Sequence, residues 1–171
     1  VDGNVLDLVI DYMTCVVVPV LFVLNFDLFP KGLELPIASL IMFTSVLWFS
    51  RKDIETKDMW FRGFPAGWNM VITALWLCNF GHIFNTVLCL VFIVLTMTPS
   101  VKFFHILGSP QLRIYTVTLS SVLIATMVLM ILLDGEHHNM LGKIIISVWL
   151  VYYIGTSIWR SLQGDELPEY L

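Results

Sequence analysis

Charge is scarce in this chain, and that scarcity excludes most soluble folds. Only 13% of its 171 residues are charged and 58% are hydrophobic, whereas soluble domains have roughly a quarter charged and about half apolar residues. A fold of this size has too little interior to bury so many apolar side chains. The composition therefore predicts an all-α, polytopic transmembrane helical bundle, with a single domain over 1–171 and a polar tail at 163–171.

Cysteine pairs and leader-peptide features are also lacking. The cysteines Cys15, Cys78 and Cys89 all lie in apolar runs and form no CxxC pair, so we expect free buried thiols rather than a disulfide or a zinc site. The first apolar run has no basic leader and no small-residue cleavage site, which does not fit a signal peptide. The chain starts with valine inside a patterned stretch, and we expect it to be the later part of a longer protein.

Hydropathy predicts six membrane segments in this chain. The third and fourth are separated at Asn79–His82, because about 32 continuous residues at 1.5 Å each would be too long for one crossing. A loop is expected at 98–110, and a solvated polar turn near 134–139. The six segments are 4–26, 35–49, 66–80, 83–97, 111–133 and 140–162.

Basic residues divide unevenly between the two sides that six crossings define. If residue 1 is cytosolic, seven basic residues lie on the cytosolic side and two on the other, which agrees with the positive-inside rule. Both ends of the chain are then cytosolic. The cytosolic set is Arg51, Lys52, Lys57, Arg62, Lys102, Arg113 and Arg160, and the opposite set is Lys31 and Lys143.

Two acids at the start of the first segment are the main candidate site. Gly3, Asp7 and Asp11 recur every four residues and share one helix face, with the two carboxylates about 6 Å apart along the axis. Such carboxylates repel unless a cation or a proton lies between them. Oxygen-only ligands favour magnesium or manganese, although solvated acids at a helix N-terminus are an alternative. No second intramembrane acid pair follows, so a partner helix or a phosphate-rich substrate must complete an ion site.

The same three residues form GxxxDxxxD, which resembles the second half of the signature of the CDP-alcohol phosphotransferase family. The pattern DGxxLDxxxDYxT at 2–14, FxGFPxxWN at 61–69 and the stretch TMTPSVKFFHILGSPQLR at 96–113 extend the resemblance through most of the chain. The first half of the signature, DxxDGxxAR, is absent. The resemblance implies two further helices upstream that carry it.

The resemblance implies a reaction and a role for each acid. A phosphatidyl group would pass from CDP-diacylglycerol to an alcohol, and the longer patterns imply choline as the acceptor, giving phosphatidylcholine and CMP. Asp7 and Asp11 would bind a divalent metal, manganese or magnesium. Asp11 would also be the catalytic base, and Gly3 would let the cytidine side approach. The expected setting is a bacterial inner membrane with the site facing the cytosol. The expected partners are membrane lipid and a second copy of the chain in a homodimer, with no nucleic acid.

Aromatic and basic side chains supply weaker candidates for substrate contacts. Aromatic faces hold quaternary ammonium groups, and we expect Tyr12, Phe64 and Trp68 to line the choline site. Arg113, at a helix start, is a candidate for binding lipid phosphate. The alternatives are an interfacial aromatic belt and attraction of basic residues to anionic lipid.

Three other functions stay open at this point. The first is the same transfer with serine, inositol or glycerol phosphate as the acceptor alcohol, although the FxGFPxxWN pattern argues against this alternative. The second is an ion-coupled transporter, which would usually place its acids near the midplane and contain internal repeats. The third is a non-catalytic membrane scaffold.

Overall fold

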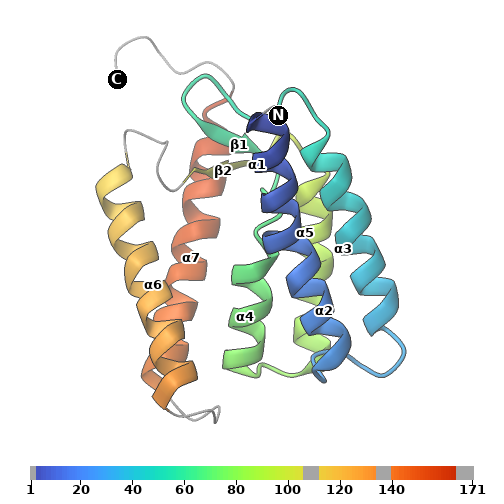
Figure 1. Ribbon diagram of the computed structural model, residues 1–171. Helices are drawn as coiled ribbons and strands as arrows, with labels where there is room; N and C mark the ends of the chain where they lie inside the picture. Colours follow the sequence, from blue (N-terminus) through green and yellow to red (C-terminus); the bar gives the residue numbers. More distant parts are fainter. Residues whose placement is uncertain (1–2, 106–111, 134–139, 165–171) are drawn as a thin grey trace. The chain divides into compact units, whose positions relative to one another are not determined.

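The structure is a computed structural model that describes residues 3–105, 112–133 and 140–164 (Figure 1). The polar turn predicted at 134–139 and most of the predicted tail lie outside these residues. Along the described chain the elements are α1 (Gly3–Tyr12), the π-helical turn η1 (Met13–Val17), α2 (Val18–Asn25), α3 (Glu34–Phe49), β1 (Trp60–Arg62), α4 (Trp68–Cys78), α5 (His82–Thr96), β2 (Lys102–Phe104), α6 (Arg113–Leu133) and α7 (Met140–Leu162).

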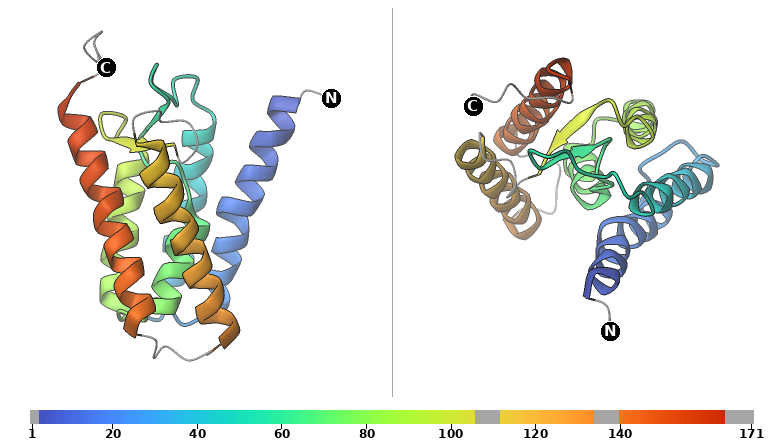
Figure 2. Two further views of the ribbon diagram at one scale, coloured as in Figure 1. Left: turned by 90° about the vertical axis from the view of Figure 1, so that its left-hand side faces the viewer. Right: turned by 90° about the horizontal axis from the view of Figure 1, so that it is seen from above.

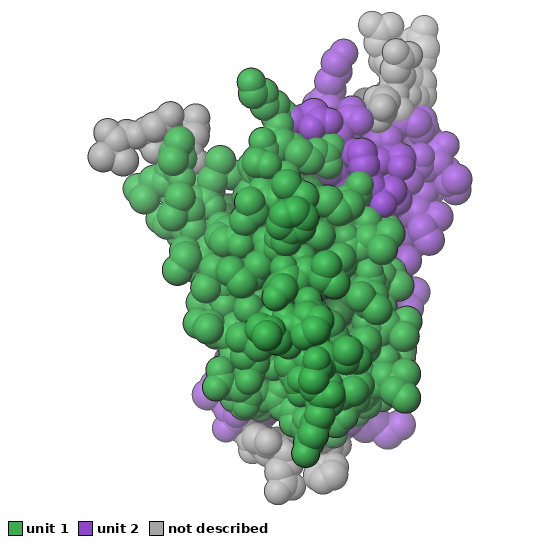
Figure 3. Space-filling model, turned by 90° about the vertical axis from the view of Figure 1, so that its right-hand side faces the viewer, with its two compact units in different colours: residues 1–52, 64–97 green, residues 53–63, 98–171 purple. Residues whose placement is uncertain are grey.

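The chain forms two compact units, each built from two stretches of sequence (Figure 3). Unit 1 comprises Val1–Lys52 and Phe64–Met97, and unit 2 comprises Asp53–Gly63 and Thr98–Leu171. The prediction of one domain over the whole chain stays a prediction.

Unit 1 is a group of apolar helices around a buried aromatic and aliphatic core. The elements α1, η1 and α2 run end to end as one rod (Figure 2). The rod packs against α3 and α4, and α3 also packs against α5. Side chains such as Val23, Ile41 and Phe92 are at most 1% exposed. Burial of these apolar side chains is what holds the helices of unit 1 together.

A tight turn separates α4 from α5, as the sequence predicts. Asn79 ends α4 in the left-handed conformation, with φ of 47°, and its N–H donates to Leu75 O. Asparagine tolerates this conformation better than most residues. Gly81, with φ of 102°, then leads into α5. The prediction that residues 66–97 form two helices and not one is therefore confirmed.

Unit 2 pairs two helices with a short antiparallel ribbon. α6 packs against α7, and α7 packs against β2. Strands β1 and β2 pair in the register Trp60↔Phe104, Phe61↔Phe103 and Arg62↔Lys102. The prediction of a loop over 98–110 is wrong where β2 forms, and the all-α prediction did not include this two-stranded ribbon. A strand of three residues is too short to show a period of two in the sequence.

Among the described residues, three helical stretches are long and apolar enough to cross a membrane: Val5–Asn25, Arg113–Leu132 and Met140–Leu162. The chain is therefore a membrane protein. The other apolar helices, α3, α4 and α5, have 16, 11 and 15 residues. They reach about 24, 17 and 23 Å, which is short of a hydrocarbon core of about 30 Å.

Candidate active site

The acid pair lies on α1, at the free end of the long rod in unit 1. Helix α1 contains Gly3, Asp7 and Asp11 at four-residue spacing, which places all three on one face, one turn apart. A Cβ added to Gly3 would meet no heavy atom within 4 Å. No packing between described residues therefore requires glycine at this position, which leaves its backbone accessible to a ligand.

The first turns of α1 are exposed on every side. All the residues from Val5 to Asp11 are exposed, including Val5 at 57% and Val9 at 54%. The two carboxylates are thus open among the described residues. Because charged groups in a membrane segment almost always face a polar cavity or a partner, this face needs polar surroundings when the helix is in a bilayer.

The donor atoms of this pair suit a hard divalent cation, but they form only part of a coordination set. Within the described part of the chain, no cluster of three or more His, Cys, Asp or Glu residues is placed to hold a metal ion. Magnesium and manganese bind carboxylate oxygens and need about six ligands in all. Asp7 and Asp11 fit as two of the protein ligands, and the remaining oxygens must come from elsewhere.

Tyr12, the residue after Asp11, lies against α3. Its hydroxyl donates to Met42 O at 3.2 Å, and its ring meets Phe49 edge to face, with centroids 5.9 Å apart. Tyr12 therefore fixes the inner side of α1 while Asp11 stays exposed. Its predicted contact with choline stays a prediction.

Phe64 and Trp68 are buried in the core of unit 1. They are 2% and 0% exposed, and the Phe64 ring lies 5.3 Å from Trp68 and 4.6 Å from Phe92. Trp68 Nε1 donates to the Oγ of Ser45 on α3 at 2.9 Å. Helix α3 thus holds both Tyr12 and Trp68. A choline contact at Phe64 or Trp68 stays a prediction, and it would require their neighbours to move.

Arg113 begins α6 and is exposed. It belongs to unit 2, whereas Asp7 and Asp11 belong to unit 1. Its predicted contact with lipid phosphate stays a prediction.

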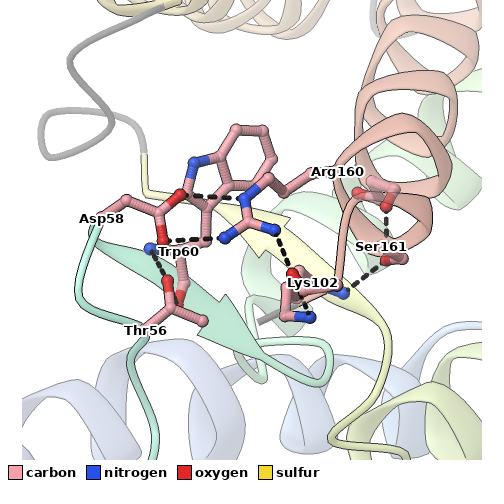
Figure 4. Close-up of polar contacts among 8 residues, drawn as sticks. Thr56, Asp58, Trp60, Lys102, Arg160 and Ser161 are labelled. Carbon is pink, nitrogen blue, oxygen red and sulfur yellow. Dashed lines mark hydrogen bonds and ion pairs between the residues drawn. The ribbon is translucent and has the colours of Figure 1, made fainter. Parts of the chain in front are cut away.

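A buried ion pair in unit 2 was not singled out from the sequence (Figure 4). Arg160, in the last turn of α7, is 0% exposed. Its Nε and Nη2 donate to the two carboxylate oxygens of Asp58 at 2.8 and 2.9 Å. This forked geometry is the strongest arrangement that an arginine and a carboxylate form.

The same arginine also ties the end of α7 to β2. Arg160 Nη1 and Lys102 Nζ both donate to Gly164 O, at 2.6 and 3.1 Å. The backbone N–H of Lys102 donates to Ser161 Oγ at 2.8 Å. These contacts join the loop before β1, the strand β2 and the C-terminal end of α7 into one polar cluster (Figure 4).

Two opposing effects act on the pKa of Asp58. Burial raises the pKa, while hydrogen bonds from Arg160 and Thr56 and the charge of Arg160 lower it, with the net result that the pKa lies below its ordinary value of 3.8. Asp58 is therefore ionised at neutral pH. A basic residue in the last turn of an apolar helix was the available signal, but nothing in the sequence links it to an acid 102 positions earlier.

The molecule is a mostly helical membrane protein that carries a pair of acids at the start of one membrane helix. Its sequence is similar to bacterial phosphatidylcholine synthases. It is 31% identical over 164 residues to the phosphatidylcholine synthase of Pseudomonas aeruginosa, covering 94% of this chain and 66% of that protein. The phosphatidylcholine synthase of Legionella pneumophila is 36% identical over 100 residues, or 58% of this chain and 39% of that protein. That of Bradyrhizobium diazoefficiens is 37% identical over 111 residues, or 62% and 38%.

The chain thus spans just under two thirds of the Pseudomonas protein, and smaller shares of the other two are matched. No family model matches this sequence. No solved structure matches it either.

Proposed function

We propose that this protein transfers the phosphatidyl group of CDP-diacylglycerol to choline, giving phosphatidylcholine and CMP. The observation that carries the proposal is the similarity to the phosphatidylcholine synthase of Pseudomonas aeruginosa over 94% of this chain. In the reaction the choline oxygen forms a bond to the β-phosphorus while the bond from that phosphorus to the CMP oxygen breaks. The hydroxyl proton passes to a base.

Within this proposal Asp11 is the base, and Asp7 and Asp11 together hold a divalent metal, manganese or magnesium. When bound, such an ion neutralises charge on the diphosphate. Gly3 leaves room beside the helix for the cytidine side, because no described atom beyond its chain neighbours and the backbone of its own helix lies within 4 Å of the position of a Cβ. Tyr12, Phe64, Trp68 and Arg113 are the remaining candidates for contact with choline or lipid phosphate.

The proposed setting is a bacterial inner membrane, with six crossings in this chain and the acid pair at the cytosolic face. The long helices account for three crossings, and α3, α4 and α5 would supply three more if the bilayer thins around them. The excess of basic residues on one side supports this orientation. A homodimer is part of the proposal.

The test uses the full-length protein in membranes with radiolabelled choline, CDP-diacylglycerol and manganese. We expect label in phosphatidylcholine, and a fall of at least about 100-fold for Asp11→Asn, the loss typical of a missing general base. Asp27→Asn is the matched control, because Asp27 is an exposed acid elsewhere in unit 1. No incorporation by the folded parent protein would refute the function, and unchanged incorporation by Asp11→Asn would refute the assigned base.

A further inference from the structure

The rod that carries the acid pair is interrupted by one π-helical turn directly after Tyr12. Met13–Val17 form this turn, and the N–H of Val18 donates to Met13 O, five residues back. Turns of this kind are rare, and they occur frequently at functional sites. The position of this one, between the acids and the buried half of the rod, raises the question of what it does.

Proline explains why the turn lies here. Pro19 has no backbone N–H, and in a regular helix its ring would clash with the carbonyl four residues earlier, that of Cys15. A wider turn before Pro19 relieves this clash. The Oγ1 of Thr14 donates to Ile10 O at 2.9 Å and lies 3.4 Å from Asp11 O, which supplies a donor to carbonyls beside the interruption.

The turn also changes the angle between two faces of the rod. We call Asp7 and Asp11 the acid face, and Val16, Val20 and Val23, all at most 3% exposed, the buried face. In an uninterrupted α-helix with 100° per residue, the two faces would lie about 170° apart around the axis. A π turn takes up one extra residue without advancing the helix, so the angle becomes about 70°.

We propose that the π turn Met13–Val17 sets the rotational position of the acid face, moving it from the outer side of the rod to the margin of its packed side. Tyr12 agrees with this placement, because it neighbours Asp11 and contacts α3 through Met42 and Phe49. The catalytic benefit of this placement rests on the proposed function, whereas the rotation itself does not.

The rotation is tested directly by a spin-label scan of the full-length protein. Single cysteines at positions 5–23, in a background with Cys15, Cys78 and Cys89 changed to serine, carry a nitroxide. Collision rates with oxygen, which concentrates in lipid, and with a water-soluble nickel chelate give the helical phase. A periodicity of 3.6 residues per turn, fitted to the accessibilities at positions 5–12, can be extended along the rod. We expect the accessibility pattern at positions 18–23 to be rotated by about 100° from that extension. One unbroken phase along the rod would overturn the proposal.

A pair of length variants tests the role in catalysis. Deleting Val17, together with Pro19→Ala, gives a regular helix with the acid face unmoved, so choline incorporation stays within a few-fold of the parent. Inserting one alanine after Val17 turns the acid face by about 100°. The highest nickel accessibility then moves from positions 7 and 11 to positions 8 and 12, and choline incorporation falls at least about 100-fold. Val17→Ala is the control at constant length.

The outcomes separate this inference from the proposed function. If deletion and insertion move the accessibility pattern equally, or if the insertion moves it and leaves incorporation unchanged, the positioning role is refuted. If the patterns behave as expected but the parent transfers no choline, the proposed function fails while the rotation stands.

Discussion

The ion pair between Asp58 and Arg160 predicts an asymmetric response to removing its two members. The side chain of Arg160 is 0% exposed and that of Asp58 is 17% exposed. Asp58→Asn leaves a guanidinium that cannot lose its charge buried without a counter-charge, with only neutral acceptors, the amide oxygen at position 58 and Gly164 O. Leaving a buried charge unpaired costs about 3–5 kcal/mol.

The opposite variant, Arg160→Met, is expected to cost less. The carboxylate of Asp58 keeps its bond with Thr56 and has access to water, and methionine fills much of the space that the arginine stem leaves. We expect a cost of about 1–2 kcal/mol, the lower part of the range for an unpaired polar group. Combining the two changes removes the stranded charge, so the double variant is more stable than Asp58→Asn alone.

Thermal unfolding of the full-length protein in detergent measures these differences. At roughly 2–4 °C per kcal/mol for a protein of this size, Asp58→Asn lowers the midpoint by about 6–20 °C. Arg160→Met lowers it by a few degrees. Equal losses for the two single variants, or a double variant that is no better than Asp58→Asn, would show that the buried arginine is not the source of the penalty.

Three further predictions concern separate parts of the structure. First, because the pKa of Asp58 is lowered on folding, its contribution to stability is complete above its ordinary pKa of 3.8 and is lost as pH falls through the lower folded pKa. Unfolding midpoints measured from pH 2 to 6 show this pH-dependent loss in the parent protein and not in Asp58→Asn. Second, a Cβ at Gly142 would meet the flexible Met130 side chain, which can move aside, and alanine favours the helix, so Gly142→Ala changes the unfolding midpoint by the equivalent of at most about 1 kcal/mol. Third, Asn79 has φ of 47°, so Asn79→Val lowers the unfolding midpoint by an amount equivalent to about 1–2 kcal/mol, and Asn79→Gly does not.

The helices were predictable because each is an apolar run bounded by polar or turn-forming residues. The predicted 140–162 and 35–49 match α7 and α3 closely, and the break at Asn79–Gly81 follows from length alone. No comparable local signal marks β1 and β2. Their three residues each find partners only because unit 2 brings together segments some forty positions apart in the sequence.

The candidate site also has features that the sequence predicts and features that it does not. The four-residue spacing of Asp7 and Asp11 is enough to place them on one face, because the segment between them is regular helix. The π turn beyond Tyr12 is not predictable from periodicity, since Pro19 alone fits a kink as well as a widened turn. The burial of Phe64 and Trp68 depends on contacts with Phe92 and Ser45, which no sequence motif records.

Acceptor-dependent release of CMP tests the proposed transfer to choline directly. The full-length protein in membranes or detergent receives CDP-diacylglycerol and manganese, with choline, serine, inositol or glycerol phosphate added separately. We expect CMP release with choline alone among the four, matched mole for mole by phosphatidylcholine and lost in Asp11→Asn. Release with another acceptor and not with choline, or release that is unaffected by Asp11→Asn, would contradict this expectation.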